Sequence, residues 1–334
     1  MLSSNARMFI HSMQSVLPDA KSTLSGWQTI LPTPPRQMDG AVVWVGMRSY
    51  LLMCMAVLGM VFPSCATEKN LTAAIALGLM GEDGGDRLFY YPTKDAPFTP
   101  KKYGYAYEDV TFPSNGGVQL HGWWIPAKEA KATVVYAHGN AGSVAHHFVF
   151  VYWLIDAGYN VLLYDYRGYG KSGGKVAKDG IVMDAAAALK YASAREGAGD
   201  IIAFGHSLGG AKTLAALKEV APERLKAVVV DSTFSSYQDM AERVAGAKAR
   251  KVVSASHDPV DCVRGLPAGV PILIVHGTAD ETIPFEQAQK LHAAAKKPKE
   301  LMAVEGGNHV NCFFIKEGRY REKLLGWMSD VLRD

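Results

Sequence analysis

The sequence predicts an α/β protein in which helices cover both faces of a mostly parallel central β-sheet. Short apolar runs rich in β-branched residues alternate with segments of helical periodicity from about residue 88 to the C-terminus. A continuous apolar run indicates a strand buried on both faces, and the helical segments between such runs supply the layers that bury it. Glycine-rich turns that join a strand to the following helix are the second sign of this architecture.

The elements follow in chain order. Residues 107–113 and 118–126 predict a β-hairpin, because the intervening Asn115-Gly116-Gly117 is a turn sequence. The other strands are predicted at Ala132–His138, Asn160–Asp165, Asp200–Gly205, Leu225–Asp231, Pro271–His276 and Glu300–Val304. Helices are predicted at Ser143–Ala157, Asp179–Ala194, Leu208–Val220, Phe285–Ala295 and Glu317–Leu332. About 40 residues separate Asp231 from Pro271, so any cap over the sheet must be small.

Composition limits the classes of function. With 49% hydrophobic and 20% charged residues, the chain of 334 residues can bury a substantial core. A net charge of +3, without a basic cluster interleaved with aromatics, argues against a nucleic-acid partner. None of the four cysteines has metal-ligand spacing, and the adjacent His146 and His147 point about 100° apart on a helix. We therefore expect neither a metal nor a cofactor.

An apolar segment near the N-terminus has the anatomy of a secretory signal. Met47-Arg48 precedes the apolar run Ser49–Phe62, and the small residues Ser64 and Cys65 follow it. Phe62-Pro63-Ser64-Cys65 resembles the lipobox of bacterial lipoproteins, which implies that Cys65 is lipidated after cleavage before it. The alternative is an uncleaved transmembrane helix over Ala41–Phe62, whose length suffices to span a bilayer.

These features divide the chain into four parts. Residues 1–46 form an unstructured extension, or the true start is Met47; residues 47–64 resemble a signal peptide. Residues 65–87 are predicted to be a linker, and residues 88–334 the α/β domain. We expect the domain in the bacterial cell envelope, as a membrane-anchored lipoprotein or on the periplasmic side, or else held by a single N-terminal transmembrane anchor.

The candidate nucleophile is Ser207, in Gly205-His206-Ser207-Leu208-Gly209. This G-x-S-x-G sequence lies between a predicted strand and a predicted helix, where a nucleophile elbow exposes a serine hydroxyl above the sheet. Glycine is required on both sides because the two backbones pass too close for a Cβ. The N-terminal amides of the new helix also point to the oxygen on which negative charge develops.

A nucleophilic serine needs a base, and the base needs an orienting carboxylate. His309 is the candidate base, because it follows the last predicted strand in a flexible glycine loop. The other histidines after Ser207 lie in a polar loop, in an apolar strand and in a helix: His257, His276 and His292. Asp280 is the candidate acid, since it follows the preceding strand; Asp231 and Glu281 remain alternatives.

Two backbone amides are predicted to form the oxyanion hole. One belongs to Leu208, directly after the nucleophile, and the other to the loop His138-Gly139-Asn140-Ala141 after an earlier strand. Asn140 is the candidate there, with Ala141 as the alternative. We expect the His138 side chain to form a hydrogen bond within the loop and to transfer no proton.

Together these motifs resemble the α/β-hydrolase family that includes the Bem46-like and ABHD17-like serine hydrolases. The resemblance rests on His138–Gly142, Tyr164–Ser172, Gly205–Gly209, His276–Asp280 and Gly307–His309, in this order. It implies the α/β-hydrolase fold with at most a small cap, and hydrolysis of carboxylic esters or thioesters. It also implies that Arg167–Gly170 packs beside the oxyanion loop. The chain departs from the family pattern after His309, where Val310-Asn-Cys-Phe-Phe314 follows.

The expected function is acyl-enzyme hydrolysis of a small-molecule ester, in which Ser207 carries the acyl group. An amide or peptide substrate is the nearest alternative, since the same triad serves both; a catalytically inactive, membrane-tethered scaffold is another. The sequence predicts no oligomeric state. Cys262 and Cys312 are predicted to form a disulfide if the domain is exported, or else to be two separate buried side chains.

Overall fold

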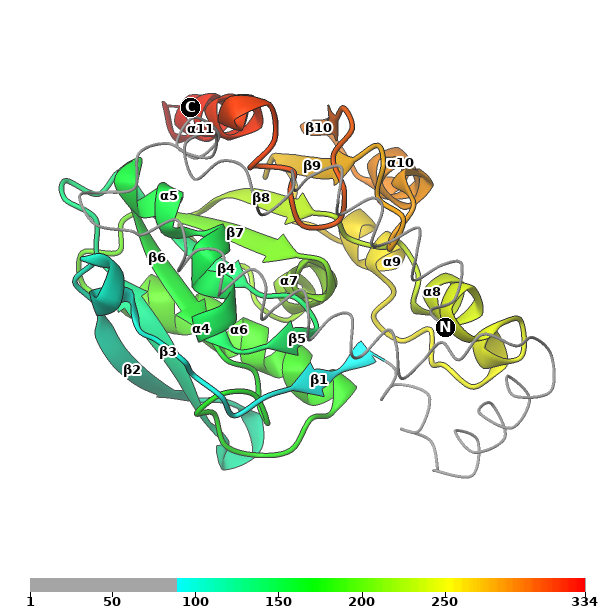
Figure 1. The fold of residues 1–334 in the computed structure, drawn as a ribbon, viewed down its shortest axis with the longest axis horizontal. Helices are drawn as coiled ribbons and strands as arrows, with labels where there is room; N and C mark the ends of the chain where they lie inside the picture. The colour runs from blue at the N-terminus through cyan, green and yellow to red at the C-terminus, as the bar shows by residue number, and fades with distance from the viewer. Residues whose placement is uncertain (1–88, 334) are drawn as a thin grey trace, which may run out of the picture.

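The computed structural model describes residues 89–333 (Figure 1). Its strands are β1 (Tyr91–Pro92), β2 (Glu108–Pro113), β3 (Gln119–Ile125), β4 (Ala132–Ala137), β5 (Ala141–Gly142), β6 (Tyr159–Tyr164), β7 (Ile201–His206), β8 (Leu225–Asp231), β9 (Ile272–Gly277) and β10 (Lys299–Val304). Its α-helices are α4 (Val144–His147), α5 (Tyr152–Asp156), α6 (Lys178–Ala194), α7 (Leu208–Glu219), α8 (Tyr237–Ala245), α9 (Pro259–Arg264), α10 (Phe285–Ala294) and α11 (Arg319–Arg333). The predicted signal segment and Cys65 lie outside the described residues.

An eight-stranded sheet forms the centre of the domain, in the order β10-β9-β8-β7-β4-β6-β3-β2. Neighbouring strands from β10 to β6 run parallel, whereas β3 pairs antiparallel with both β6 and β2. The antiparallel pair β2 and β3 is the predicted hairpin, joined through the turn Asn115–Gly117. A separate parallel pair, β1 and β5, joins the start of the described chain to the loop after β4.

Helices cover both faces of this sheet, as predicted (Figure 1). Strand residues alternate between two apolar clusters, because successive side chains of a strand point to opposite faces. In β4, Val135 packs in the cluster under α6 and α7, whereas Val134 packs in the cluster under α5 and α11. The sheet is therefore buried on both sides, which explains the continuous apolar runs in the sequence.

One predicted helix differs from the observed structure. Residues 143–157 form two short α-helices, α4 and α5, separated by the 3₁₀ turn Phe148–Phe150. All twelve residues from Val144 to Ile155 are buried. The segment therefore lacks the polar, solvent-facing side that a continuous amphipathic helix presents. Contacts with the surrounding residues on all sides determine its backbone conformation instead.

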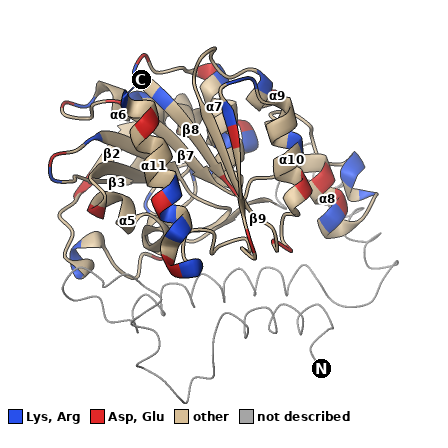
Figure 2. Ribbon diagram, turned by 90° about the horizontal axis from the view of Figure 1, so that it is seen from above, with Lys and Arg blue, Asp and Glu red and all other residues tan. Residues whose placement is uncertain are grey.

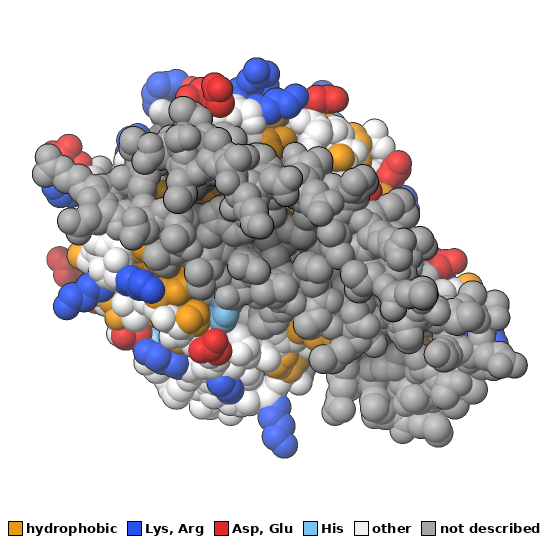
Figure 3. Space-filling view, viewed as in Figure 1, with side chains coloured by type: hydrophobic (Ala, Val, Ile, Leu, Met, Phe, Trp, Pro, Cys, Tyr) orange, Lys and Arg blue, Asp and Glu red, His pale blue; other side chains and the backbone are white. Residues whose placement is uncertain are grey.

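The connection between β8 and β9 carries two short helices, α8 and α9, so the cap is small as predicted. Helix α8 begins at a Ser236 cap, whose hydroxyl accepts a hydrogen bond from the Asp239 N–H. Acidic and basic residues occur together along the helices (Figure 2), and side chains of both charges lie on the described surface seen in Figure 3. Among residues 89–333, no helix has the length and apolar character needed to cross a bilayer.

Candidate active site

Ser207 lies in a sharp turn between β7 and α7, with φ 54° and ψ −119°. Only close packing of two backbones holds a serine in this unfavourable conformation. A Cβ on Gly205 would lie 2.4 Å from the carbonyl oxygen of Gly209. A Cβ on Gly209 would lie 2.0 Å from the carbonyl oxygen of Ala137, at the end of β4. The glycines of G-x-S-x-G are thus required by the approach of α7 to β7 and β4.

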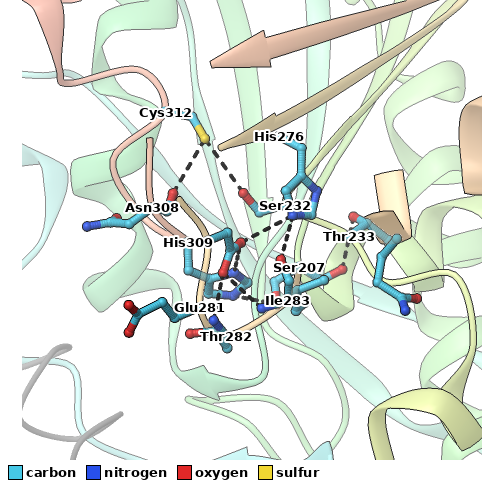
Figure 4. Close-up of polar contacts among 12 residues, drawn as sticks. Ser207, Ser232, Thr233, His276, Glu281, Thr282, Ile283, Asn308, His309 and Cys312 are labelled. Atoms are coloured by element: carbon cyan, nitrogen blue, oxygen red, sulfur yellow. Dashed lines mark hydrogen bonds and ion pairs between the residues drawn. The ribbon is translucent and has the colours of Figure 1, made fainter. Parts of the chain in front are cut away.

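The structure brings together the three residues predicted as nucleophile, base and acid. His309 Nε2 lies 3.0 Å from Ser207 Oγ, and His309 Nδ1 lies 2.8 Å from Asp280 Oδ2. Figure 4 shows the His309 ring between the serine and the loop after β9. His309 lies in the loop after β10, where Gly306 has a positive φ of 70°. Each group comes from the carboxyl end of a different parallel strand, so all meet at one edge of the sheet.

Four hydrogen-bonding groups surround the buried Asp280 carboxylate. Its Oδ1 accepts from the N–H groups of Thr282 and Ile283, at 2.9 and 2.8 Å. Its Oδ2 accepts from His309 and lies 3.3 Å from His276 Nε2. His276 Nε2 also lies 2.8 Å from the carbonyl oxygen of Ile283. Because a carbonyl only accepts, His276 carries its proton on Nε2 and donates toward both oxygens.

His276 therefore does more than the sequence predicted. It forms a hydrogen bond to the backbone from within its strand, but it also lies 3.3 Å from the carboxylate of Asp280. The motif His276-Gly-Thr-Ala-Asp280 places the two residues four positions apart. That spacing across the end of β9 is the signal from which the contact could have been found.

Charge and burial set opposing trends in the pKa values of the pair. Burial alone favours the neutral imidazole, but the charge and hydrogen bond of Asp280, with the charge of Asp231, raise the pKa of His309. Burial alone would raise the pKa of Asp280, but the His309 charge and the hydrogen bonds from His276 and His309 lower it. Asp280 therefore stays ionised at neutral pH and favours a protonated His309.

Asp231, the alternative acid, contacts different groups. Its Oδ2 lies 2.9 Å from His206 Nδ1, and its Oδ1 accepts from Ser232 Oγ at 3.0 Å. Its backbone carbonyl accepts the N–H of Ser207 at 2.8 Å. Asp231 thus supports the nucleophile turn, while Asp280 contacts His309. Glu281, the other alternative, is exposed, and its side chain points away from His309 in Figure 4.

The two predicted oxyanion amides lie at the N-terminus of α7 and in the loop after β4. Leu208 is the first residue of α7, so its N–H has no partner within the helix. Asn140 lies in the loop between β4 and β5. Within residues 89–333, neither N–H donates to a backbone carbonyl. Ala141, the alternative to Asn140, instead belongs to β5, which pairs with β1.

The predicted disulfide is wrong. Cys262 and Cys312 are both free and buried. Cys262 packs in the apolar cluster with α7 and α10, whereas Cys312 packs in the cluster on the other face of the sheet with α11. The sheet therefore separates Cys262, in helix α9, from Cys312, and the two thiols cannot pair. The alternative, two separate small buried side chains, is what the structure contains.

Sequence comparisons relate the chain to several proteins. A family model described as serine aminopeptidase, S33 matches residues 128–258. The chain is 34% identical over 253 residues to the uncharacterized protein YfhR of Escherichia coli O157:H7, a match that covers 73% of this chain and 87% of YfhR. It is 33% identical to the alpha/beta hydrolase domain-containing protein WAV2 of Arabidopsis thaliana, over 68% of this chain and 81% of WAV2. Protein bem46 of Schizosaccharomyces pombe is 29% identical, over 57% of this chain and 66% of bem46.

Solved structures share the fold. An esterase of Pyrococcus furiosus superposes with a TM-score of 0.59 and 22% identity, over 73% of this chain and 97% of the esterase. The protein Est1E of Butyrivibrio proteoclasticus, solved with ferulic acid bound, superposes with a TM-score of 0.55 and 21% identity, over 67% of this chain and 100% of Est1E. At these identities the superpositions support the common architecture.

Proposed function

Because this chain belongs to the α/β-hydrolase family that includes YfhR, WAV2 and bem46, we propose that it hydrolyses carboxylic esters or thioesters through an acyl intermediate on Ser207. The observation that carries the proposal is the continuous series of hydrogen bonds from Ser207 through His309 to Asp280. Structural packing alone does not require a serine, a histidine and a buried carboxylate in this order.

In the first step, Ser207 Oγ attacks the acyl carbon while His309 Nε2 takes the hydroxyl proton. The carbonyl oxygen becomes an oxyanion, which the N–H groups of Leu208 and Asn140 stabilise. Collapse of this intermediate breaks the bond to the leaving group, and His309 returns the proton to the alcohol or thiol that departs. Asp280 accepts the Nδ1 proton of His309 throughout, which fixes the tautomer and stabilises the imidazolium.

In the second step, water takes the place of Ser207 as the nucleophile. His309 removes a proton from the water, whose oxygen attacks the acyl carbon of the intermediate. The second tetrahedral intermediate releases the carboxylic acid and returns the proton from His309 to Ser207 Oγ. No cofactor enters either step, since the serine and imidazole supply both the nucleophile and the proton transfers.

The esterases among the structural neighbours support an ester substrate, whereas the family description as a serine aminopeptidase supports an amide. A pair of substrates with the same acyl group, one a p-nitrophenyl ester and the other a p-nitroanilide, distinguishes the two. We expect kcat/KM for the ester to exceed that for the anilide by several orders of magnitude. Comparable values would favour the amide hydrolase.

The test of the nucleophile is Ser207→Ala, with Ser232→Ala as the matched control. Ser207 Oγ lies 3.0 Å from His309 Nε2, whereas Ser232 Oγ donates to Asp231, and both serines are buried. We expect Ser207→Ala to lose p-nitrophenyl ester hydrolysis and fluorophosphonate labelling, while its far-ultraviolet circular dichroism stays unchanged. Ser232→Ala should still be labelled. Labelling that persists in Ser207→Ala would mean that another residue is the nucleophile, and a wild-type protein that is never labelled would favour the scaffold.

We further propose that lipid on Cys65 holds the hydrolase at a membrane of the bacterial cell envelope. The support is the sequence alone: one positive charge, an apolar run and the small residues before Cys65. A single uncleaved transmembrane segment is the alternative, and the two differ in whether fatty acid is attached to this cysteine.

A further inference from the structure

Three successive carbonyl groups of the loop after β4 each accept a hydrogen bond from a buried side chain. Tyr166 Oη donates to the carbonyl of His138 at 2.7 Å. His138 Nδ1 lies 2.8 Å from the carbonyl of Gly139. Tyr169 Oη donates to the carbonyl of Asn140 at 2.8 Å. The loop that carries the candidate oxyanion amide is therefore held at every carbonyl from residue 138 to residue 140.

The three donors are fully enclosed. Tyr166, Tyr169 and His138 all have 0% exposed surface. A carbonyl oxygen only accepts, so His138 must carry its proton on Nδ1. Burial lowers the pKa of His138 to about 4, against the weaker pull of the Asp165 charge, so the ring stays neutral at physiological pH. Each donor would be costly to leave without a partner in this interior, so the three hydrogen bonds resist rearrangement of the loop.

Peptide geometry converts anchored carbonyls into oriented amides. In a planar trans peptide, the C=O of one residue and the N–H of the next point in opposite directions. The hydrogen bond from His138 to the Gly139 carbonyl therefore determines the direction of the Asn140 N–H. The hydrogen bond from Tyr169 holds the peptide unit on the other side of Asn140, where the N–H of Tyr91 also donates to the same carbonyl at 2.9 Å.

This loop lies directly against the nucleophile helix. A Cβ on Gly209 would lie 2.6 Å from the carbonyl oxygen of His138. The same carbonyl is the one that Tyr166 binds, so the tyrosine holds the loop at its contact with the first turn of α7. Movement of the loop would change the distance between the Asn140 amide and the Leu208 amide, which both serve one oxyanion.

We propose that Tyr166, Tyr169 and His138 are positioning residues that preorganise the Asn140 amide for the tetrahedral intermediate. This inference rests on the proposed function. The hydrogen bond from His138 to the Gly139 carbonyl also polarises the peptide that carries the Asn140 N–H and strengthens that N–H as a donor. The three side chains act on the oxyanion through the backbone and do not touch the substrate.

The experiment compares Tyr166→Phe, Tyr169→Phe and the double variant with Tyr159→Phe as the matched control. Tyr159 is also buried, and its hydroxyl has no hydrogen-bond partner within residues 89–333. We expect each loop variant to lower kcat for a p-nitrophenyl ester about tenfold, well short of the roughly 10²–10³ lost with an oxyanion donor itself. KM should stay within about twofold, because the tyrosines act on the transition state.

Phenylboronic acid gives a second measurement, since its tetrahedral adduct on Ser207 presents an oxygen to the oxyanion amides. Its inhibition constant should rise by the same factor by which kcat falls. For the histidine, His138→Asn keeps an N–H donor near the position of Nδ1, and His138→Leu removes it. We expect His138→Asn to retain most of kcat and His138→Leu to lose it, at concentrations of folded enzyme matched by circular dichroism.

Loop variants that match Tyr159→Phe in kcat and in boronic acid affinity would overturn the inference while leaving the proposed function intact. A rise in KM at unchanged kcat would also overturn it, because the tyrosines would then act on substrate binding. An absence of Ser207-dependent turnover in the wild-type protein would overturn the proposed function, and the inference with it. Parallel changes in kcat and boronic acid affinity support the positioning role.

Discussion

Replacement of Asp280 by asparagine tests how the structure assigns the acid of the triad. An asparagine that keeps its oxygen at Oδ1 retains the hydrogen bonds from the N–H groups of Thr282 and Ile283. Its NH₂ group must then take the place of Oδ2, where it faces His309 and the Nε2–H of His276. The NH₂ group can donate to His309 Nδ1, which stabilises the tautomer with the proton on Nε2. That tautomer cannot accept the proton of Ser207.

The opposite rotamer of the asparagine is no better, since its NH₂ group would face two backbone N–H donors. Loss of the correct tautomer costs about 10⁴ in kcat in serine triads, or about 5 kcal/mol of transition-state stabilisation. We therefore expect Asp280→Asn to lower kcat by about four orders of magnitude at an unchanged fold. Steady-state hydrolysis of a p-nitrophenyl ester and circular dichroism measure the two quantities.

Asp231→Asn is the matched control, because Asp231 is also buried at a strand end and also binds a histidine. It contacts His206, and its charge is the smallest of the influences that raise the pKa of His309, so we expect kcat to fall about tenfold or less. A larger loss in Asp231→Asn than in Asp280→Asn would refute the assignment of Asp280. Equal losses would mean that the hydrogen bond to His309 Nδ1 does not control turnover.

Three further outcomes are expected. The kcat/KM should rise with pH as His309 loses its proton, with a midpoint above the ordinary value near 6.5 because neighbouring carboxylates raise the pKa of His309. Asp231→Asn should move that midpoint to lower pH, and a midpoint moved upward would contradict the electrostatic reasoning. Gly209→Ala would bring its Cβ 2.0 Å from a backbone carbonyl oxygen, so the free energy of unfolding measured in urea should fall by about 3 kcal/mol or more. In the control Gly326→Ala, on α11, the new Cβ meets nothing within 4 Å, and the free energy of unfolding should rise by up to about 1 kcal/mol. Finally, Cys65→Ala should abolish incorporation of a fatty-acid analogue and release the protein from membranes; incorporation that is unchanged in this variant would rule out Cys65 as the lipid site.

The local pattern of the sequence was enough to predict the architecture. The strand predicted at Asp200–Gly205 is observed as Ile201–His206, and the helix predicted at Leu208–Val220 is observed as Leu208–Glu219. Each of these elements follows from the periodicity and glycine content of about a dozen residues. Contacts with the rest of the chain do not change the secondary structure that this local pattern predicts. The segment 143–157 was not predicted correctly, because contacts on all its sides override the helical pattern.

Candidate residues at strand ends could also be named from the sequence, because their position after an apolar run is a local property. Ser207, Asp280 and His309 were named in this way, and so was the alternative acid Asp231. Which carboxylate contacts the imidazole is not a local property. Strand β8 lies beside β7, so Asp231 is adjacent to His206 and the nucleophile turn, whereas β9 and β10 bring Asp280 to His309.

The sequence by itself determined the alternation of strands and helices, the glycine turn around Ser207 and the small size of the cap. The tertiary structure alone decided the contact of His276 with Asp280, the separation of Cys262 from Cys312, and the anchoring of the loop carbonyls at 138–140. Periodicity depends on neighbours along the chain, and the sequence displays it directly. These contacts depend on strand order and on the face of the sheet to which each side chain points, and both arise only when the whole sheet has assembled.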